Sequence, residues 1–191
     1  SYGTNLVFTN QSFNSKGITS DGFYFFPSTE NSFSKVNHLK IEKFPTKGFI
    51  NYLAGPHFKN IGIETAKKIV SNKKSLSLIS KKFFTEKEIL KDFDVSEKIA
   101  KILLGYLKFS NSDHVLNIIL RELDLKPFTI NEIIKQYGEK IILAFYSPYK
   151  LLDEIKYLSI EDVDNIISKL SLNVTEEDKR DGYLTYFLKK E

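Results

Sequence analysis

The stretch from Thr46 to Val70, TKGFINYLAGPHFKNIGIETAKKIV, constrains the fold of this chain more than any other. Its pattern predicts a helix, a tight turn over residues 59–62, and a second helix. Apolar side chains recur at helical spacing in the second helix and give it a face for burial, namely Ile63, Ala66, Ile69 and Val70. Glu64 and Lys68 fall on the other side, at the i,i+4 spacing that favours an ion pair.

The turn itself has the composition of an anion-binding loop. Asn60 and Gly62 are the two residue types that enter the left-handed backbone region at the lowest cost. A turn of this kind presents backbone N–H groups at the amino end of a helix, where the helix dipole favours an anion. Small Ala66 would let the two helices approach closely. This is the pattern of a helix-hairpin-helix, which binds a nucleic-acid phosphate without reading bases. An ordinary αα-hairpin with a glycine turn is the alternative.

The charge of the chain is unevenly distributed around this stretch. The net charge is +4, but residues 51–109 alone carry twelve Lys against six acids. Residues 110–191 are acidic, with eleven Lys and Arg against fifteen acids. A basic block on an otherwise neutral chain suggests where a polyanion would bind. A solvated lysine surface explains the same counts equally well.

Changes in composition predict three segments. Residues 1–45 are rich in Phe, Ser, Asn and Thr and should form a small β-rich segment, with the aromatic content of a partial oligonucleotide-binding (OB-like) barrel. Residues 46–109 should hold a first and a second helix-hairpin-helix unit, and residues 110–191 a further helical unit with a degenerate third hairpin. The predicted fold is therefore mostly α, a tandem helix-hairpin-helix bundle after a small amino-terminal β element.

Helix starts after residue 46 are marked by capping signals. Four Ser or Thr residues are followed three positions later by an acid, and Ser147 is followed by Pro148. The four pairs are Thr85 with Glu88, Thr129 with Glu132, Ser159 with Asp162, and Thr175 with Asp178.

The hairpin pattern also repeats. Gly62, Ser96 and Ser159 occupy the same place in three similar segments, so we expect three turns. Only the first keeps Gly. Asp94 could still form the second turn, because Asp tolerates the left-handed region. The third turn, near Tyr157, lies in the acidic block and is predicted to be structural.

From EKFPTKGFINYLAGPHFKNIGIETAKKIV to YSPYKLLDEIKYLSIEDVDNIISKL, the chain resembles the amino-terminal region of RecD-like (RecD/TraA-type) ATP-dependent DNA helicases. Over roughly residues 38–190 it has the same order of elements and spacing. The family's first turn, Lys-Gly-hydrophobic-Gly, corresponds here to residues 59–62, and its Asn-Pro-Tyr-x-Leu segment to Ser147–Leu152. The later turns of the family usually carry two glycines, whereas this chain has Asp94 and Ser96, then Tyr157 and Ser159.

No enzyme chemistry is expected of the chain itself. It contains no GxxxxGK[ST] phosphate loop, no Cys and only three scattered His, so neither ATP nor a metal should bind here. The resemblance implies a parent helicase whose motor domains, in the same polypeptide, would use ATP and Mg²⁺. The absence of Met indicates that the chain has lost its start or was cut from something longer. No apolar run has the length of a membrane span, and the missing Cys fits a reducing cytoplasm.

Two functions remain open. The first is a DNA-binding accessory region of a superfamily 1 helicase of the exodeoxyribonuclease V alpha-subunit type, with a role in DNA repair and recombination. It would contact phosphates without sequence preference, because the chain has only two Arg for reading base edges. The second is a scaffold or protein-interaction domain whose degenerate hairpins make no direct DNA contact. The residues predicted to contact DNA are Lys59, Asn60, Ile61, Gly62, Ile63, Lys67 and Lys68, with Lys98 and Lys101 as weaker candidates.

Overall fold

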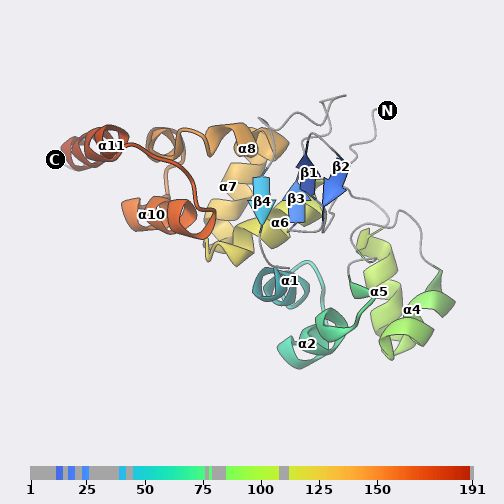
Figure 1. Ribbon diagram of the computed structural model, residues 1–191. Coiled ribbons are helices and arrows are strands. Elements are labelled where there is room, and N and C mark those ends of the chain that lie inside the picture. The colour runs from blue at the N-terminus through green and yellow to red at the C-terminus, as the bar shows by residue number, and fades with distance from the viewer. Residues whose placement is uncertain are drawn as a thin grey trace.

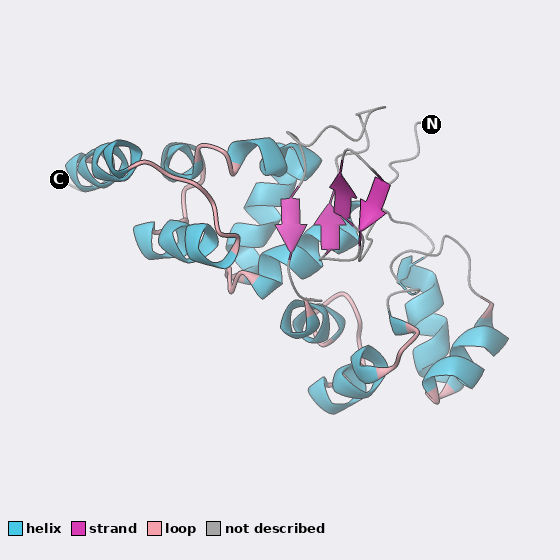
Figure 2. Cartoon of the chain, viewed as in Figure 1, coloured by secondary structure: helices cyan, strands magenta, loops and turns pink. Residues whose placement is uncertain are grey.

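The computed structural model is mostly helical, with four short strands near the amino end (Figures 1 and 2). It describes residues 12–14, 17–19, 23–25, 39–41, 45–75, 78, 85–107 and 112–189. Within these residues the mostly α fold class is confirmed.

The strands form two small antiparallel pairs. β1 (Ser12–Asn14) pairs with β2 (Gly17–Thr19), and β3 (Phe23–Phe25) pairs with β4 (Leu39–Ile41). The two pairs belong to separate two-stranded sheets. The partial barrel over residues 1–45 therefore stays a prediction.

Two helical hairpins follow and share one hydrophobic cluster. α1 (Thr46–Leu53) and α2 (Ile63–Ser71) form the first hairpin, and α4 (Glu86–Phe93) and α5 (Glu97–Leu107) form the second. The buried side chains of this first cluster come from all four helices and from the turn between α1 and α2. They include Phe49, Tyr52, Leu53, Phe58, Ile61, Ala66, Ile69, Ile89, Phe93, Ala100 and Leu103.

The rest of the chain builds a second cluster. Its elements are α6 (Ser112–Glu122), α7 (Pro127–Tyr137), η1 (Gly138–Lys140), α8 (Ile141–Ala144), η2 (Pro148–Lys150), α9 (Leu151–Glu154), α10 (Ile160–Lys169) and α11 (Glu176–Leu188). Apolar side chains of these elements and of the turns between them fill it, among them Leu116, Ile119, Leu120, Leu125, Ile130, Leu158, Val163 and Ile166. α11 contributes no fully buried residue and lies at the carboxyl end of the fold (Figure 1).

Helix α6 joins the two clusters. Ile118 belongs to the first, whereas the neighbouring Ile119 belongs to the second, because adjacent residues on a helix point about 100° apart. α1 packs very closely on α6 at Gly48, where a Cβ atom would lie 2.1 Å from the carbonyl oxygen of Ile118. The Gly48 N–H donates to Glu122 Oε2 at 2.6 Å. Only glycine permits this approach.

The predicted helix starts are right at most positions. Thr85 and Ser159 each form a complete capping box with the acid three residues on, and Thr175 caps α11. η2 begins after Ser147, with Pro148 at its first position. The start at Thr129 is wrong: α7 begins two residues earlier at Pro127, and Thr129 is buried inside the helix. Proline at the first helical position, with its preset φ, defines that start.

Candidate nucleic-acid interface

The sequence suggests left-handed backbone at Asn60 and Gly62 in the turn between α1 and α2, and the structure has it at one of these two positions. Asn60 has φ 72°. Gly62 does not: its φ is −81° and its ψ is 171°, which is extended backbone open to any residue. A left-handed Gly62 was therefore a wrong expectation, and Asn60 is the residue of this turn with a positive φ. Ile61 is buried, and its backbone N–H donates to the carbonyl oxygen of Phe58 at 3.1 Å, so neither its side chain nor this N–H is open to a ligand.

The amino end of α2 is open. Gly62 occupies the N-cap position, no side chain caps the helix, and the space around a Cβ at Gly62 is empty to 4 Å. The other two repeated turns differ, because a serine hydroxyl occupies the same place. Ser96 Oγ accepts from the N–H of Ile99 at 3.4 Å, and Ser159 Oγ accepts from that of Asp162 at 3.1 Å. Of the three turns, only the first leaves these donors for an external acceptor.

Ile63 lies beside this opening and does not belong to the core. Its side chain is 55% exposed, whereas Ala66, Ile69 and Val70 are buried as predicted. As the first residue of α2, Ile63 projects past the hairpin instead of into it. Its assignment to the buried face was wrong.

The lysines near the turn differ in how they are paired. Lys67 Nζ lies 2.7 Å from Glu64 Oε1. The predicted pair of Glu64 with Lys68 does not form, because Lys68 reaches out of its own helix. Its Nζ lies 2.7 Å from Asp94 Oδ2 and donates to the Asp94 carbonyl oxygen at 2.9 Å. Lys59 is exposed and makes no ion pair among the described residues.

The second turn is built around Asp94. Its φ of 48° confirms the prediction that an aspartate adopts the left-handed region here. The Lys68 ammonium group hydrogen-bonds the Asp94 carboxylate and lowers its pKa. Two residues before Asp94, Asp92 makes similar contacts. Asn72 Nδ2 donates to the Asp92 carbonyl oxygen at 2.5 Å, and Lys74 Nζ lies 2.6 Å from the Asp92 carboxylate. The carboxyl end of α2 is thereby bound to the carboxyl end of α4, and the two hairpins are held together.

Lys98 and Lys101 lie on α5, the helix that follows the second turn. Both are exposed, and Lys101 Nζ is 3.9 Å from Glu86 Oε1. Among the described contacts neither lysine is bonded to the first hairpin, and the two hairpins are linked through Lys68 to Asp94 and through Asn72 and Lys74 to Asp92. Their part in one common site with residues 59–63 stays a prediction.

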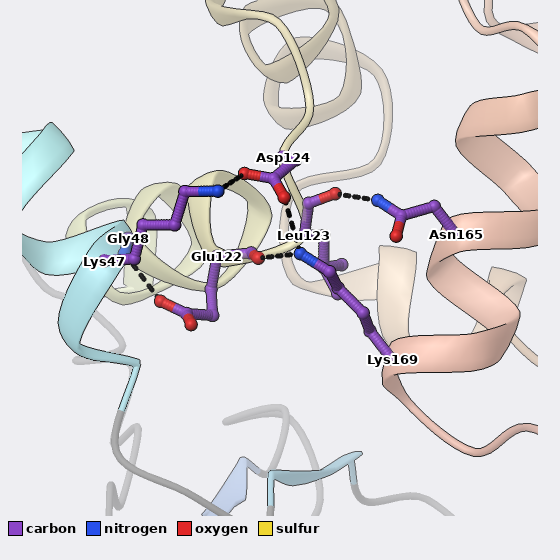
Figure 3. Close-up of polar contacts among 7 residues, drawn as sticks. All are labelled: Lys47, Gly48, Glu122, Leu123, Asp124, Asn165 and Lys169. Carbon is purple, nitrogen blue, oxygen red and sulfur yellow. Dashed lines mark hydrogen bonds and ion pairs between the residues drawn. The ribbon is translucent and has the colours of Figure 1, made fainter.

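A polar junction that the sequence did not reveal lies at the carboxyl end of α6 (Figure 3). Asp124, with φ 63°, accepts from Lys47 of α1 on one carboxylate oxygen and from Lys169 of α10, at 2.7 Å, on the other. Lys169 Nζ also donates to the Glu122 carbonyl oxygen at 2.9 Å, and Asn165 Nδ2 donates to that of Leu123 at 2.7 Å. Both lysines lower the pKa of Asp124. The signal that could have found it is the one used for Asp94, an aspartate in a turn between two helices, where Asp tolerates the left-handed region.

Other features of the surface do not suit a polyanion or a metal. A pocket of about 330 Å³ between η2 and α11 is lined by Lys150 but also by Asp153, Asp178 and Asp181. Over the described ranges, no group of three or more His, Asp or Glu side chains is placed to hold a metal ion. No helix in the same part of the chain is long and apolar enough to cross a membrane.

Comparison with protein-family models gave a match in the carboxyl-terminal part of the chain. Residues 110–191 match the family model described as the ATP-dependent RecD2 DNA helicase HHH domain, where HHH denotes helix-hairpin-helix. The resemblance to the helix-hairpin-helix region of RecD-like helicases is thus confirmed over these residues. The searches of curated proteins and of solved structures gave no match. The first hairpin lies before the matched range, so its role is argued from its geometry.

Proposed function

With residues 110–191 matching the HHH domain of RecD2 helicases, we propose that the chain is a non-catalytic DNA-binding accessory region of a RecD-like superfamily 1 helicase. It contacts DNA phosphates without sequence preference, through the first hairpin. The motor domains, with their ATP and Mg²⁺, belong to other parts of the same polypeptide, and the parent acts in the cytoplasm in DNA repair or recombination.

The observation that carries this proposal is the uncapped amino end of α2. Gly62 supplies no side chain to cap the helix, a Cβ there would meet nothing within 4 Å, and Lys59 is exposed three residues earlier. A phosphate oxygen would satisfy these donors, with the helix dipole adding a favourable field. Lys67 stands one turn along the same helix, and its exposed pair with Glu64 contributes little energy that a phosphate would have to replace.

One observation favours the alternative, a scaffold without DNA contact. Lys68 is bound to the turn of the second hairpin through both the carboxylate and the carbonyl oxygen of Asp94. In this arrangement Lys68 supports the packing of the two hairpins. We therefore assign phosphate contact mainly to Lys59, Lys67 and the backbone of Asn60, Gly62 and Ile63.

The salt dependence of binding distinguishes the two functions. Duplex DNA with a fluorescent label is titrated with protein at several salt concentrations, and log Kobs is plotted against log salt. Each lost phosphate contact should reduce the slope by about one unit. We expect Lys59→Ala with Lys67→Ala to reduce it by up to about two. A scaffold without DNA contact would bind the duplex weakly, and the two substitutions would leave the slope of log Kobs against log salt unaltered.

The control is a lysine on another surface. Lys135 is exposed on α7, and Lys135→Ala should leave both the affinity and the slope unchanged. Lys169 is unsuitable as a control, because it holds Asp124 and the Glu122 carbonyl group. Equal binding of scrambled duplexes of one length would support the absence of sequence preference, and a tenfold preference would contradict it.

A further inference from the structure

Two exposed aromatic rings meet at the surface of the matched domain. Phe128, in the first turn of α7, is 55% exposed, and Tyr157, just before α10, is 46% exposed. Their ring centroids are 4.1 Å apart, with the planes inclined at 64°. The two residues are 29 positions apart in the sequence, so the fold brings them together. We call them the aromatic pair.

The core does not require this pair. Leu125 precedes the N-cap of α7 and Ile130 is at its fourth position, and both are buried in the second cluster. Leu158 and Val163 occupy the same two positions around α10 and are buried in the same cluster. These are the positions of a hydrophobic staple, which fixes how the chain enters a helix. Each helix start is thus already anchored, and Phe128 and Tyr157 are additional apolar surface.

Cations flank the pair. Lys156 Nζ lies 5.4 Å from the centroid of the Tyr157 ring, and Lys126, the N-cap of α7, is exposed two residues before Phe128. An aromatic face next to an ammonium group has the two parts that bind an unpaired nucleotide, a surface for the base and a charge for its phosphate. The acidic balance of residues 110–191 makes stacking the main expected source of affinity.

We propose that the aromatic pair is a stacking site for the bases of single-stranded nucleic acid, with Lys126 and Lys156 beside the backbone. This inference rests on the proposed function in supposing a DNA ligand, but it assigns a different site and a different strand state. The first hairpin holds phosphates, whereas Phe128 and Tyr157 contact bases that no longer have a partner strand.

Substitution of each ring tests the proposal. Phe128→Ala and Tyr157→Ala are measured for binding to labelled oligo(dT) and to a duplex of the same length. Each should weaken binding to oligo(dT) by about tenfold, since loss of one stacked base typically has this effect. Duplex affinity and the salt slope should not change, because stacking releases no counterions. Both rings are exposed, so the unfolding midpoint, measured by circular dichroism, should remain near that of the wild type.

The absence of Trp from the chain allows a direct readout. Tyr157→Trp introduces a single indole at the pair, and oligo(dT) should quench its emission. Tyr146→Trp is the matched control, because Tyr146 is another exposed tyrosine, at 55% against 46% for Tyr157, but lies on the loop before η2. Its emission should be unchanged by oligo(dT).

The outcomes separate this inference from the proposed function. If the Ala variants bind oligo(dT) like the wild type, or lose duplex and single-strand affinity equally, the stacking site is wrong. Unquenched emission from the Tyr157→Trp variant would also overturn the stacking site. So would an emission change that depends only on protein concentration, because it would indicate a contact between protein molecules. If the wild type binds neither DNA form, both proposals fail. If only the Lys59 and Lys67 changes alter binding, the proposed function survives alone.

Discussion

At the scale of single residues, Gly48 is the position where one added atom should matter most. A Cβ there would lie 2.1 Å from the Ile118 carbonyl oxygen and 2.7 Å from the Glu122 nitrogen, both backbone atoms that side-chain rotation does not move. We expect Gly48→Ala to lower the free energy of unfolding by about 1–3 kcal/mol, the usual cost of overpacking. Urea denaturation followed by circular dichroism measures this change.

Gly105 provides the control for this substitution. It lies within α5 and a Cβ there would meet nothing within 4 Å. Gly105→Ala should therefore raise the free energy of unfolding, by roughly 0.5–1 kcal/mol, because alanine loses less backbone freedom on folding. Destabilisation of similar size at both positions would show that the close packing of α1 on α6 is not the cause.

The backbone conformation and side-chain pairing of some turn residues could be predicted from the sequence, and those of others could not. Asn60 and Asp94 adopt the left-handed region, as their residue types suggested. Gly62 does not, because a glycine permits a positive φ without requiring one. The pairing of Lys68 was missed since local spacing favoured Glu64, whereas the fold brings Asp94, 26 positions away, within 2.7 Å.

At the scale of elements, α11 is held by a small number of contacts. Tyr149 donates to Asp164 Oδ1 at 2.7 Å, Tyr183 of α11 donates to the other carboxylate oxygen, and the Tyr149 ring packs on Gly182 so closely that a Cβ would lie 2.5 Å from its Cγ. Burial and the hydrogen bond to the Asp164 carboxylate raise the pKa of Tyr149.

We expect Asp164→Asn to loosen α11 selectively, since it weakens two charge-assisted hydrogen bonds at once. Amide hydrogen exchange over Glu176–Leu188 should become about tenfold faster, while exchange in α2 serves as the internal reference and stays the same. Unchanged protection of α11 would show that Tyr183 and Gly182 do not depend on this carboxylate.

The junction at the end of α6 should make stability depend on pH. Hydrogen bonds from Lys169 and Lys47 lower the pKa of Asp124 below its ordinary value, so the folded state favours the carboxylate. This contribution is complete above about pH 4, the unfolded value, and is lost as the pH falls through the lower folded pKa. Solvent screening keeps it modest, because the Asp124 side chain is 43% exposed.

The matched variant for this prediction is Asp124→Asn, because Asn also tolerates the left-handed backbone of this position. Its urea midpoint should lie below that of the wild type at pH 7, and the difference should narrow as the pH is lowered below 4. If the two urea midpoints differ by the same amount at pH 7 and below pH 4, the ion pairs contribute nothing to stability and the substitution acts through the shape of the side chain.

Helix starts show the limit of local signals at this scale. Thr85, Ser159 and Thr175 were recognisable because a cap needs only residues within one turn of itself. At α7 two local signals competed, and Pro127 prevailed over Thr129 because tertiary packing buries the threonine side chain. The contribution of α6 to both clusters could not be predicted from the sequence, because it depends on which helices pack against each side of α6.

At the scale of the whole molecule, α6 should make the two clusters unfold together. Ile118 is fully buried against the first cluster, and Ile118→Ala would leave a cavity costing about 2–4 kcal/mol. We expect amides of α2 and α10 to report coincident urea transitions in the wild type and in this variant, both shifted to lower urea in the variant. Two separate transitions, with only that of α2 shifted, would contradict the coupling.

The shared helix has a mechanical consequence. A force applied at the first turn, near Asn60, passes through α1 into α6 at Gly48 and leaves at the ion-paired end of α6 into α10. Within the described residues, the steps after the turn are the close packing of α1 on α6 at Gly48 and the hydrogen bonds from Lys169 to Asp124 and to the Glu122 carbonyl oxygen. If the first hairpin binds DNA as proposed, a pull on it should displace α10 together with α1.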